Sequence, residues 1–123
     1  MTSEFSGADL IADALAQLEV EHVFAIVSIH NMPMLDATNR LGKTQIIDVR
    51  HEQAGTHAAD GYARASGKLG VMIASTGPGT SNTVTGLYEA QYGSSRVLVI
   101  TGQAETASVS YTHLTLPTTY GVW

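Results

Sequence analysis

The spacing of apolar residues predicts a helix near the start of the chain and a short strand after it. Ser6 is a suitable N-cap, and the apolar residues behind it recur at helical spacing: Leu10, Ile11, Ala14, Leu15 and Leu18. The segment His22–Val27 is short and mostly apolar, which is typical of a buried strand. The pattern therefore predicts a helix that ends near Leu18 and a strand that follows it.

The same alternation continues along the chain. A second helix is predicted around 34–41, since Pro33 lies near its first turn and Gly42 lies just past its end. Further strands are predicted over 44–49, 71–74 and 97–101, and further helices over 52–66 and 81–92. The apolar run 97–101 favours a strand covered on both faces. Short connections between alternating elements predict an α/β fold, a doubly wound parallel sheet with helices on both faces and about four strands.

Composition narrows the classes of function. The chain has 123 residues, enough for one small domain. A net charge of −5 argues against nucleic-acid binding and leaves no basic patch for a membrane surface. The absence of cysteine excludes disulfides and thiolate metal sites, and no apolar run approaches the roughly 20 residues that span a bilayer. The first residues do not resemble a signal peptide, so we expect a cytoplasmic protein without nucleic-acid or membrane partners.

Two features at the predicted strand ends could bind a ligand. Glu52 stands where a strand gives way to a helix, although the helix dipole by itself favours an acidic residue there. The segment Gly77–Asn82 leaves a strand and opens a helix, a geometry that suits an anion. It lacks the lysine of a phosphate-binding P-loop and does not match the dinucleotide fingerprint. From the residues alone, a plain tight turn and an anion-binding loop both remain open.

Three segments taken together indicate a protein family far more specifically than either feature alone. They are Arg-His-Glu-Gln-Ala at 50–54, Ala-Asp-Gly-Tyr-Ala-Arg at 59–64 and Ser-Thr-Gly-Pro-Gly-Thr-Ser-Asn at 75–82. This combination resembles the pyrimidine-binding domain of thiamine-diphosphate enzymes of the acetolactate synthase, benzoylformate decarboxylase and benzaldehyde lyase superfamily. The resemblance covers residues 10–103. It implies thiamine diphosphate as cofactor and a small 2-oxo acid or aldehyde as substrate.

The resemblance assigns roles to residues around the cofactor. Glu52 is implied to hydrogen-bond N1′ of the aminopyrimidine and to activate the cofactor for ylid formation by general acid–base catalysis. An apolar pocket would raise the proton affinity of such a carboxyl group by desolvation. Pro78, Gly79 and Asn82 match positions that line the aminopyrimidine ring.

Three further residues are candidates on the substrate side. His30 follows the first strand, at the edge where open α/β sheets bind ligands, and benzaldehyde lyase-type members have a histidine at the matching place. A histidine there could relay protons near neutral pH, so His30 is a second catalytic candidate, although a plain loop histidine is an open alternative. Ser28 lies in the same loop, and Gln103 follows the last predicted strand. For Gln103 a structural role in its loop is also open.

The resemblance leaves the reaction open. Acetolactate synthases usually have a glycine-rich Pro-Gly-Gly segment where this chain has Ala25–Ser28, so decarboxylase, carboligase and lyase activities all fit. In this family Mg²⁺ and the diphosphate bind a separate domain, and no metal site is predicted in this chain. FAD stays open as a further cofactor of the complete enzyme. That enzyme is implied to be a homodimer or homotetramer with its active site between subunits.

The chain is therefore interpreted as a truncated pyrimidine-binding domain over residues 1–108, with an incomplete sheet. It is expected to be inactive by itself, because the diphosphate-binding domain is missing. The alternative function is that of a non-catalytic α/β module that binds an anionic ligand at Gly77–Asn82.

Residues 109–123 are predicted not to be native. The codons GTC TCT TAT ACA CAT CTG ACG CTG CCG ACG would encode residues 109–118, and they read as the reverse complement of a transposase adapter used for sequencing libraries. Residues 119–122 fit the index and the GTG that follow, whereas Trp123 departs from the adapter by one base. The nucleotide sequence of the gene tests this prediction, and any other run of codons would overturn it.

Overall fold

The computed structural model of the chain describes residues 5–103. The predicted non-native tail, 109–123, lies outside these residues.

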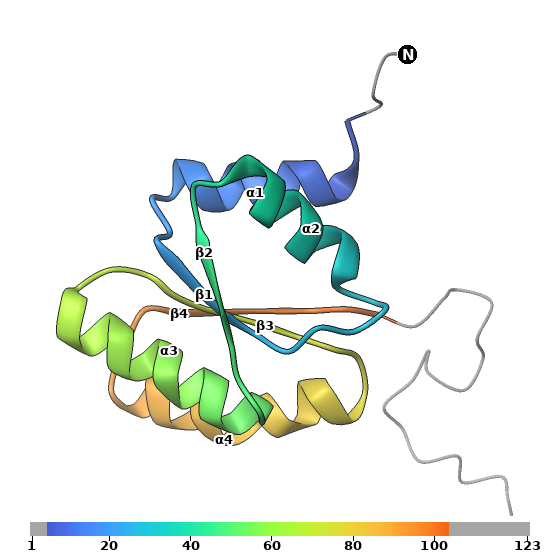
Figure 1. Ribbon diagram of the computed structural model, residues 1–123. Helices are drawn as coiled ribbons and strands as arrows, with labels where there is room; N and C mark the ends of the chain where they lie inside the picture. The colour runs from blue at the N-terminus through green and yellow to red at the C-terminus, as the bar shows by residue number, and fades with distance from the viewer. Residues whose placement is uncertain (1–4, 104–123) are drawn as a thin grey trace, which may run out of the picture.

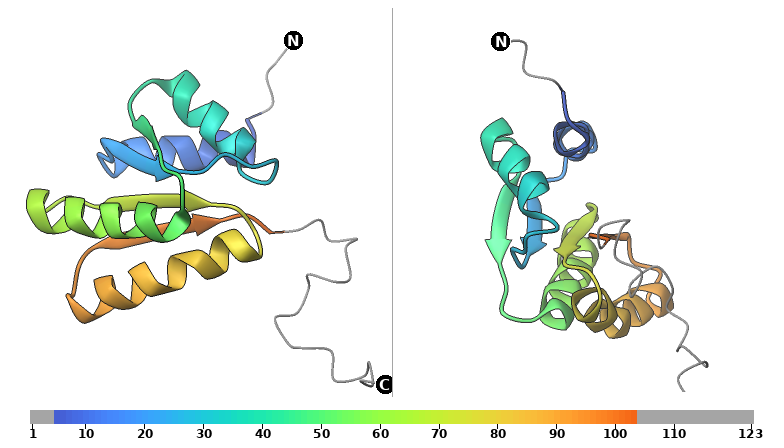
Figure 2. Two further views of the ribbon diagram at one scale, coloured as in Figure 1. Left: turned by 60° about the horizontal axis from the view of Figure 1, so that its bottom comes forward. Right: turned by 90° about the vertical axis from the view of Figure 1, so that its right-hand side faces the viewer.

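Within the described residues, four helices alternate with four strands (Figure 1). In chain order they are α1 (Gly7–Gln17), β1 (His22–Ala25), α2 (Met32–Leu41), β2 (Gln45–Asp48), α3 (Glu52–Ser66), β3 (Gly70–Ala74), α4 (Pro78–Tyr92) and β4 (Val97–Thr101). The strands form one parallel sheet in the order β2-β1-β3-β4. Helices α1 and α2 lie on one face of this sheet, and α3 and α4 lie side by side on the other (Figure 2). The predicted doubly wound α/β fold is confirmed.

The sheet separates two packed layers. On the side of α1 and α2, the core consists of Leu15, Val20, Val23, Ala25, Met34, Leu35, Val71 and Ile73. The wholly buried Met72 points to the other side, where it meets α3. Alternate residues of β3 therefore serve the two faces, which explains why every residue of this strand is buried.

Some element boundaries differ from those predicted, and so does the burial of one strand. Helix α4 begins at Pro78 rather than near residue 81, because Gly77 takes a positive φ of 55° before it and proline suits a first helical position. Strand β1 ends at Ala25, and Val27 beyond it is 60% exposed. The expectation that 97–101 is covered on both faces was wrong. Among the described residues β4 is an edge strand that pairs with β3 alone, and its Leu98 is 36% exposed.

Glycines let α3 approach its neighbours closely. A Cβ atom on Gly70 of β3 would lie 2.0 Å from the carbonyl oxygen of Ala59, and one on Gly55 would lie 2.5 Å from the sulfur of Met72. On the other side of α3, a Cβ on Gly86 of α4 would lie 2.6 Å from the Cβ of Thr56. Because all three distances are shorter than real contacts, larger side chains would force α3 away from β3 and α4.

Two residues of the 59–64 segment join α3 to the end of α4. Asp60 is buried, and Arg64 pairs with it at 2.9 Å while also donating to Ser95 and to Glu89. Burial raises the pKa of Asp60, but the Ser95 hydroxyl and the Arg64 guanidinium outweigh this effect and keep that pKa below its ordinary value. A Cβ atom on Gly93 would lie 2.3 Å from an Arg64 nitrogen. This part of the segment is thus structural.

Tyr62, which lies between Asp60 and Arg64 in α3, contacts the turn before β1. Its hydroxyl donates to Glu21 at 3.1 Å, and Glu21 also pairs with Lys68. The tyrosine ring also meets His22 edge-on, with ring centroids 5.3 Å apart. Tyr62 therefore fixes α3 to the amino-terminal side of the sheet, away from Glu52.

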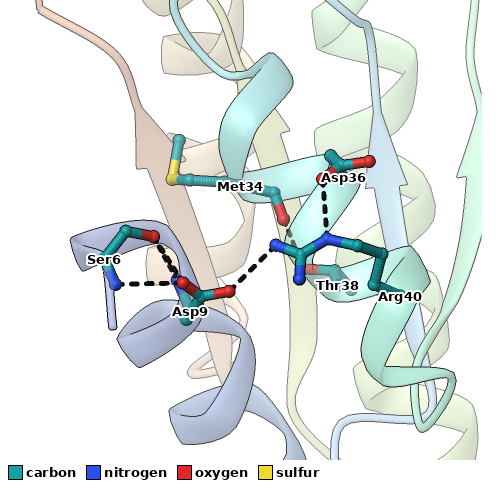
Figure 3. Close-up of polar contacts among 6 residues, drawn as sticks. All are labelled: Ser6, Asp9, Met34, Asp36, Thr38 and Arg40. Atoms are coloured by element: carbon teal, nitrogen blue, oxygen red, sulfur yellow. Dashed lines mark hydrogen bonds and ion pairs between the residues drawn. The ribbon is translucent and has the colours of Figure 1, made fainter. Parts of the chain in front are cut away.

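On the opposite face, an acidic residue links α1 to α2 (Figure 3). Ser6 and Asp9 form a reciprocal capping box at the start of α1, and Arg40 of α2 donates to Asp9 at 2.9 Å. The hydrogen bonds from Ser6 and Arg40 lower the pKa of Asp9 to about 2. The stabilisation from Asp9 is therefore complete above its ordinary value of 3.8 and disappears as the pH falls through about 2.

The contact between β3 and α3 generates a stability prediction. Gly70→Ala should destabilise the chain by about 1–3 kcal/mol or more, because the new methyl group overlaps the Ala59 carbonyl. Urea unfolding followed by circular dichroism measures the loss. Gly61→Ala is the matched control: a Cβ there meets nothing within 4 Å, so it should stabilise α3 by about 0.5–1 kcal/mol. Equal effects of the two changes would contradict the close contact.

Candidate functional site

Glu52 is the first residue of α3, at the carboxyl side of the sheet. His51 caps the helix in an extended conformation, and its Nδ1 accepts a hydrogen bond from the backbone N–H of Gln53 at 3.2 Å. The Thr56 hydroxyl donates to the Glu52 carbonyl at 2.8 Å. The backbone of Glu52 is thus fixed on both sides, and its side chain is half-buried.

The Glu52 carboxylate meets the start of α4. The side-chain amide of Asn82 donates to Glu52 Oε2 at 3.0 Å. A Cβ on Gly79, which is buried, would lie 3.2 Å from Glu52 Oε1 and 3.0 Å from the Cβ of Ser75. Glycine at 79 therefore leaves the space that Oε1 occupies. Among the hydrogen bonds of residues 5–103, Oε1 accepts none, so it can still bind a ligand.

The loop that faces Glu52 is held by its own hydrogen bonds. The Thr80 hydroxyl donates to the Ser75 carbonyl at 2.8 Å, and the Gly79 N–H donates to the Thr76 carbonyl at 3.1 Å. The positive φ of Gly77 turns the chain between strand and helix. These contacts hold Gly79 and Asn82 in place against Glu52.

The same contacts disfavour an anion site in this loop. Pro78 has no N–H, and the N–H of Gly79 already donates to Thr76, so the helix start offers fewer free donors than a phosphate site needs. The Glu52 carboxylate beside Gly79 adds a negative charge that repels an anion. The geometry favours a neutral or proton-donating ligand group.

His30 belongs to a second set of neighbouring residues at the carboxyl edge of the sheet. A Cβ on Gly102, just past β4, would lie 2.8 Å from the Cβ of His30 and 3.3 Å from Cγ2 of Thr76. Thr76 directly follows Ser75, which contacts Gly79 of the Glu52 group. Consecutive residues of the β3–α4 loop therefore connect the two groups.

The structure brings some of the predicted site residues together and leaves others apart. Glu52, Gly79 and Asn82 form one contact group, whereas Pro78 is exposed at the first position of α4. Ser28 lies in the β1–α2 loop, and its hydroxyl oxygen is buried without a hydrogen-bond partner. Gln103 is exposed past the end of β4.

Sequence reasoning missed Asn31, whose side chain is wholly buried and bonded to the backbone of the β1–α2 loop. The available signal was an asparagine directly before the proline-containing start of a helix.

The described residues contain no group of three or more His, Cys, Asp or Glu side chains that could hold a metal ion. Residues 5–103 also contain no helix of the length and apolarity required to cross a membrane.

Comparisons with known proteins agree with this geometry. The family described as "Thiamine pyrophosphate enzyme, N-terminal TPP binding domain" matches residues 5–119. An acetolactate synthase large subunit of Buchnera aphidicola (subsp. Schizaphis graminum) is 39% identical over 106 residues, which cover 86% of this chain and 19% of that protein. The acetolactate synthase large subunit of Lactococcus lactis is 41% identical over 85% of this chain and 18% of its own length. That of Parasynechococcus marenigrum is 48% identical over 80% of this chain and 16% of its own length.

The chain thus spans about a fifth of the length of the relatives it matches. The family match covers all of the described residues, including the segments that hold Glu52 and Asn82 together. The chain therefore belongs to the family of thiamine pyrophosphate enzymes and matches its N-terminal TPP-binding domain.

Proposed function

We propose that this chain is the pyrimidine-binding part of a thiamine-diphosphate-dependent enzyme that acts on 2-oxo acids, most like acetolactate synthase. The observation that supports it best is the Glu52 carboxylate, with Oε2 held by Asn82 and Oε1 beside Gly79. This arrangement presents one carboxylate oxygen, in a fixed direction, to a ligand at the carboxyl edge of the sheet.

The residues present fit an aminopyrimidine. A pyrimidine ring is flat and has ring nitrogens that share or accept a proton, which suits a half-buried carboxylate next to a glycine. Glu52 would hold or release the shared proton at Oε1, while the hydrogen bond from Asn82 to Oε2 keeps the carboxylate from rotating. When bound, thiamine diphosphate supplies a thiazolium carbon that attacks the carbonyl of a 2-oxo acid.

The proposal extends to the whole protein. The relatives at 38–48% identity are named acetolactate synthases, so a small 2-oxo acid is the proposed substrate. We place Mg²⁺ and the diphosphate on a further domain, with FAD as an additional cofactor to test. A homodimer or homotetramer would then assemble the active site between subunits, in the cytoplasm. Within this proposal His30 faces the substrate, and Ser28 and Gln103 lie beside it.

Proton transfer by Glu52 is tested by a hybrid enzyme in which residues 5–103 replace the matching segment of the Lactococcus lactis large subunit. Glu52→Gln keeps the shape of the side chain but cannot take up or release the proton. It should slow exchange of the cofactor's C2 proton about 10²–10⁴-fold, the range for loss of a general acid–base group. Proton NMR of the quenched enzyme measures this exchange.

Glu89→Gln is the matched control, since Glu89 lies at the far end of α4 beside Arg64. It should leave the exchange rate unchanged. Near-normal exchange in Glu52→Gln would reject the proposed role. The 123-residue chain by itself is expected to consume no pyruvate.

The contact between Glu52 and Asn82 gives a pH-dependent prediction for the chain itself. Asn82→Asp would place a second carboxylate where the amide now lies, 3.0 Å from Glu52 Oε2. Repulsion should lower the free energy of unfolding by about 1–4 kcal/mol near neutral pH. Most of this loss should be recovered near pH ~4, where one of the two carboxylates takes up a proton. Urea unfolding at both pH values measures it.

Asn82→Ala separates repulsion from the lost hydrogen bond. It should lower the free energy of unfolding by about 0.5–1.5 kcal/mol at both pH values, because it removes the hydrogen bond but adds no charge. If Asn82→Asp behaved like Asn82→Ala throughout, the two side chains would not be in contact.

A further inference from the structure

Asn31 is a wholly buried amide at the carboxyl edge of the sheet. Its Oδ1 accepts a hydrogen bond from the backbone N–H of Ser28 at 2.7 Å, and its Nδ2 donates to the carbonyl of Ile26 at 2.9 Å. Both ends of the amide therefore bond to the backbone of one loop. A buried amide with both ends bonded has a single orientation, and its loss would leave backbone groups unpaired.

Backbone hydrogen bonds also hold the two ends of this loop. The Ser28 carbonyl accepts from the N–H groups of Asn31 at 3.1 Å and Met32 at 2.8 Å. The N–H of Ile26 donates to the carbonyl of Ile73 in β3 at 3.3 Å. The loop is thus fixed to the sheet at one end and to α2 at the other. Between these ends, the side chain of Asn31 bonds to the backbone of Ile26 and Ser28.

His30 directly precedes Asn31 in this loop, so the backbone that Asn31 fixes also carries the His30 side chain. His30 lies against Gly102, where a Cβ would come within 2.8 Å of the His30 Cβ and 3.4 Å of its carbonyl oxygen. The backbone at 102 therefore forms one wall of the space that His30 occupies. The same Cβ would lie 3.3 Å from Cγ2 of Thr76, so Gly102 also borders Thr76. Movement of the loop would separate His30 from Gly102.

We propose that Asn31 is a positioning residue for this enzyme: it fixes the β1–α2 loop so that His30 stays against Gly102, at the same edge of the sheet as the Glu52 group. The proposal rests on the proposed function, in which His30 faces the substrate. Asn31 would affect the reaction only by holding His30 in position. The loop tip that it shapes also presents two exposed apolar side chains, Val27 and Ile29, on either side of Ser28.

The first test uses the full 123-residue chain without cofactor and measures amide hydrogen exchange by NMR. Asn31→Ala should speed exchange of the Ser28 amide about tenfold, since this amide loses its acceptor. Asn31→Asp keeps an acceptor oxygen and should retain most of the protection. Asn39→Ala is the matched control. Asn39 is an exposed asparagine of α2, the helix that follows Asn31, and its replacement should leave Ser28 exchange unchanged. Unchanged Ser28 exchange in Asn31→Ala would overturn the proposal.

The second test uses the hybrid enzyme. Asn31→Ala should lower kcat about tenfold, leave C2-proton exchange near normal, and remove the limb of the pH profile that His30→Ala also removes. Asn31→Asp should restore part of kcat. Gly102→Ala displaces His30 directly without touching the Asn31 hydrogen bonds, so it should lower kcat while Ser28 exchange stays slow.

The outcomes separate this inference from the proposed function. If Asn31→Ala slowed C2-proton exchange as much as kcat, Asn31 would support the fold as a whole, and the positioning role would be rejected. If His30→Ala left kcat and the pH profile unchanged, the positioning role would also fail, although Glu52 could still act. Only near-normal C2-proton exchange in Glu52→Gln would reject the proposed function itself.

Discussion

The close approach of α3 to both β3 and α4 is the constraint on which the site depends. Gly70 lets the Ala59 backbone contact the sheet, and Gly86 lets Thr56 contact α4. With larger side chains at either place, α3 would move outward, and a helix moves as a rigid unit. Because Glu52 begins this helix and Asn82 begins the next, the 3.0 Å hydrogen bond between them follows from packing farther along both helices.

The specific segments of the sequence divide between structure and chemistry. Asp60 and Arg64 tie α3 to the end of α4, and Tyr62 ties it to the turn before β1. Glu52, Gly79 and Asn82 instead meet at the open edge of the sheet, where a ligand can reach them. The first set fixes the distance and angle between the two helices. The second set uses that geometry to present a carboxylate oxygen.

The loop at 75–82 shows why context decides what a glycine-rich helix start can bind. Its glycines and its place after a strand are features of anion sites. In the folded chain its first donors are missing or already bonded, and the Glu52 carboxylate lies beside it. A neighbouring charge from a distant part of the chain thus changes the chemistry that the local sequence favours.

The order and type of the helices and strands could be predicted from the sequence, because periodicity, caps and glycine stops are local signals. Glu52–Ser66 and Val97–Thr101 were predicted with the bounds that they have in the structure. The pairing of Glu52 with Asn82 could not be derived from spacing, since it depends on how two helices pack across a shared sheet face. The exposure of Leu98 also depended on the tertiary structure, because an apolar strand looks the same at the centre and at the edge of a sheet.

The sequence by itself thus determined the fold class and the family resemblance, and it indicated Glu52 as the first candidate for a catalytic residue. Only the tertiary structure decided what surrounds it. It showed that Asn82 donates to one oxygen of Glu52 and that the side chain of Asn31 is hydrogen-bonded to the backbone of the β1–α2 loop. The hydrogen bond between Glu52 and Asn82 joins segments far apart in the chain, so it depends on the packing of the whole domain, which no local pattern specifies.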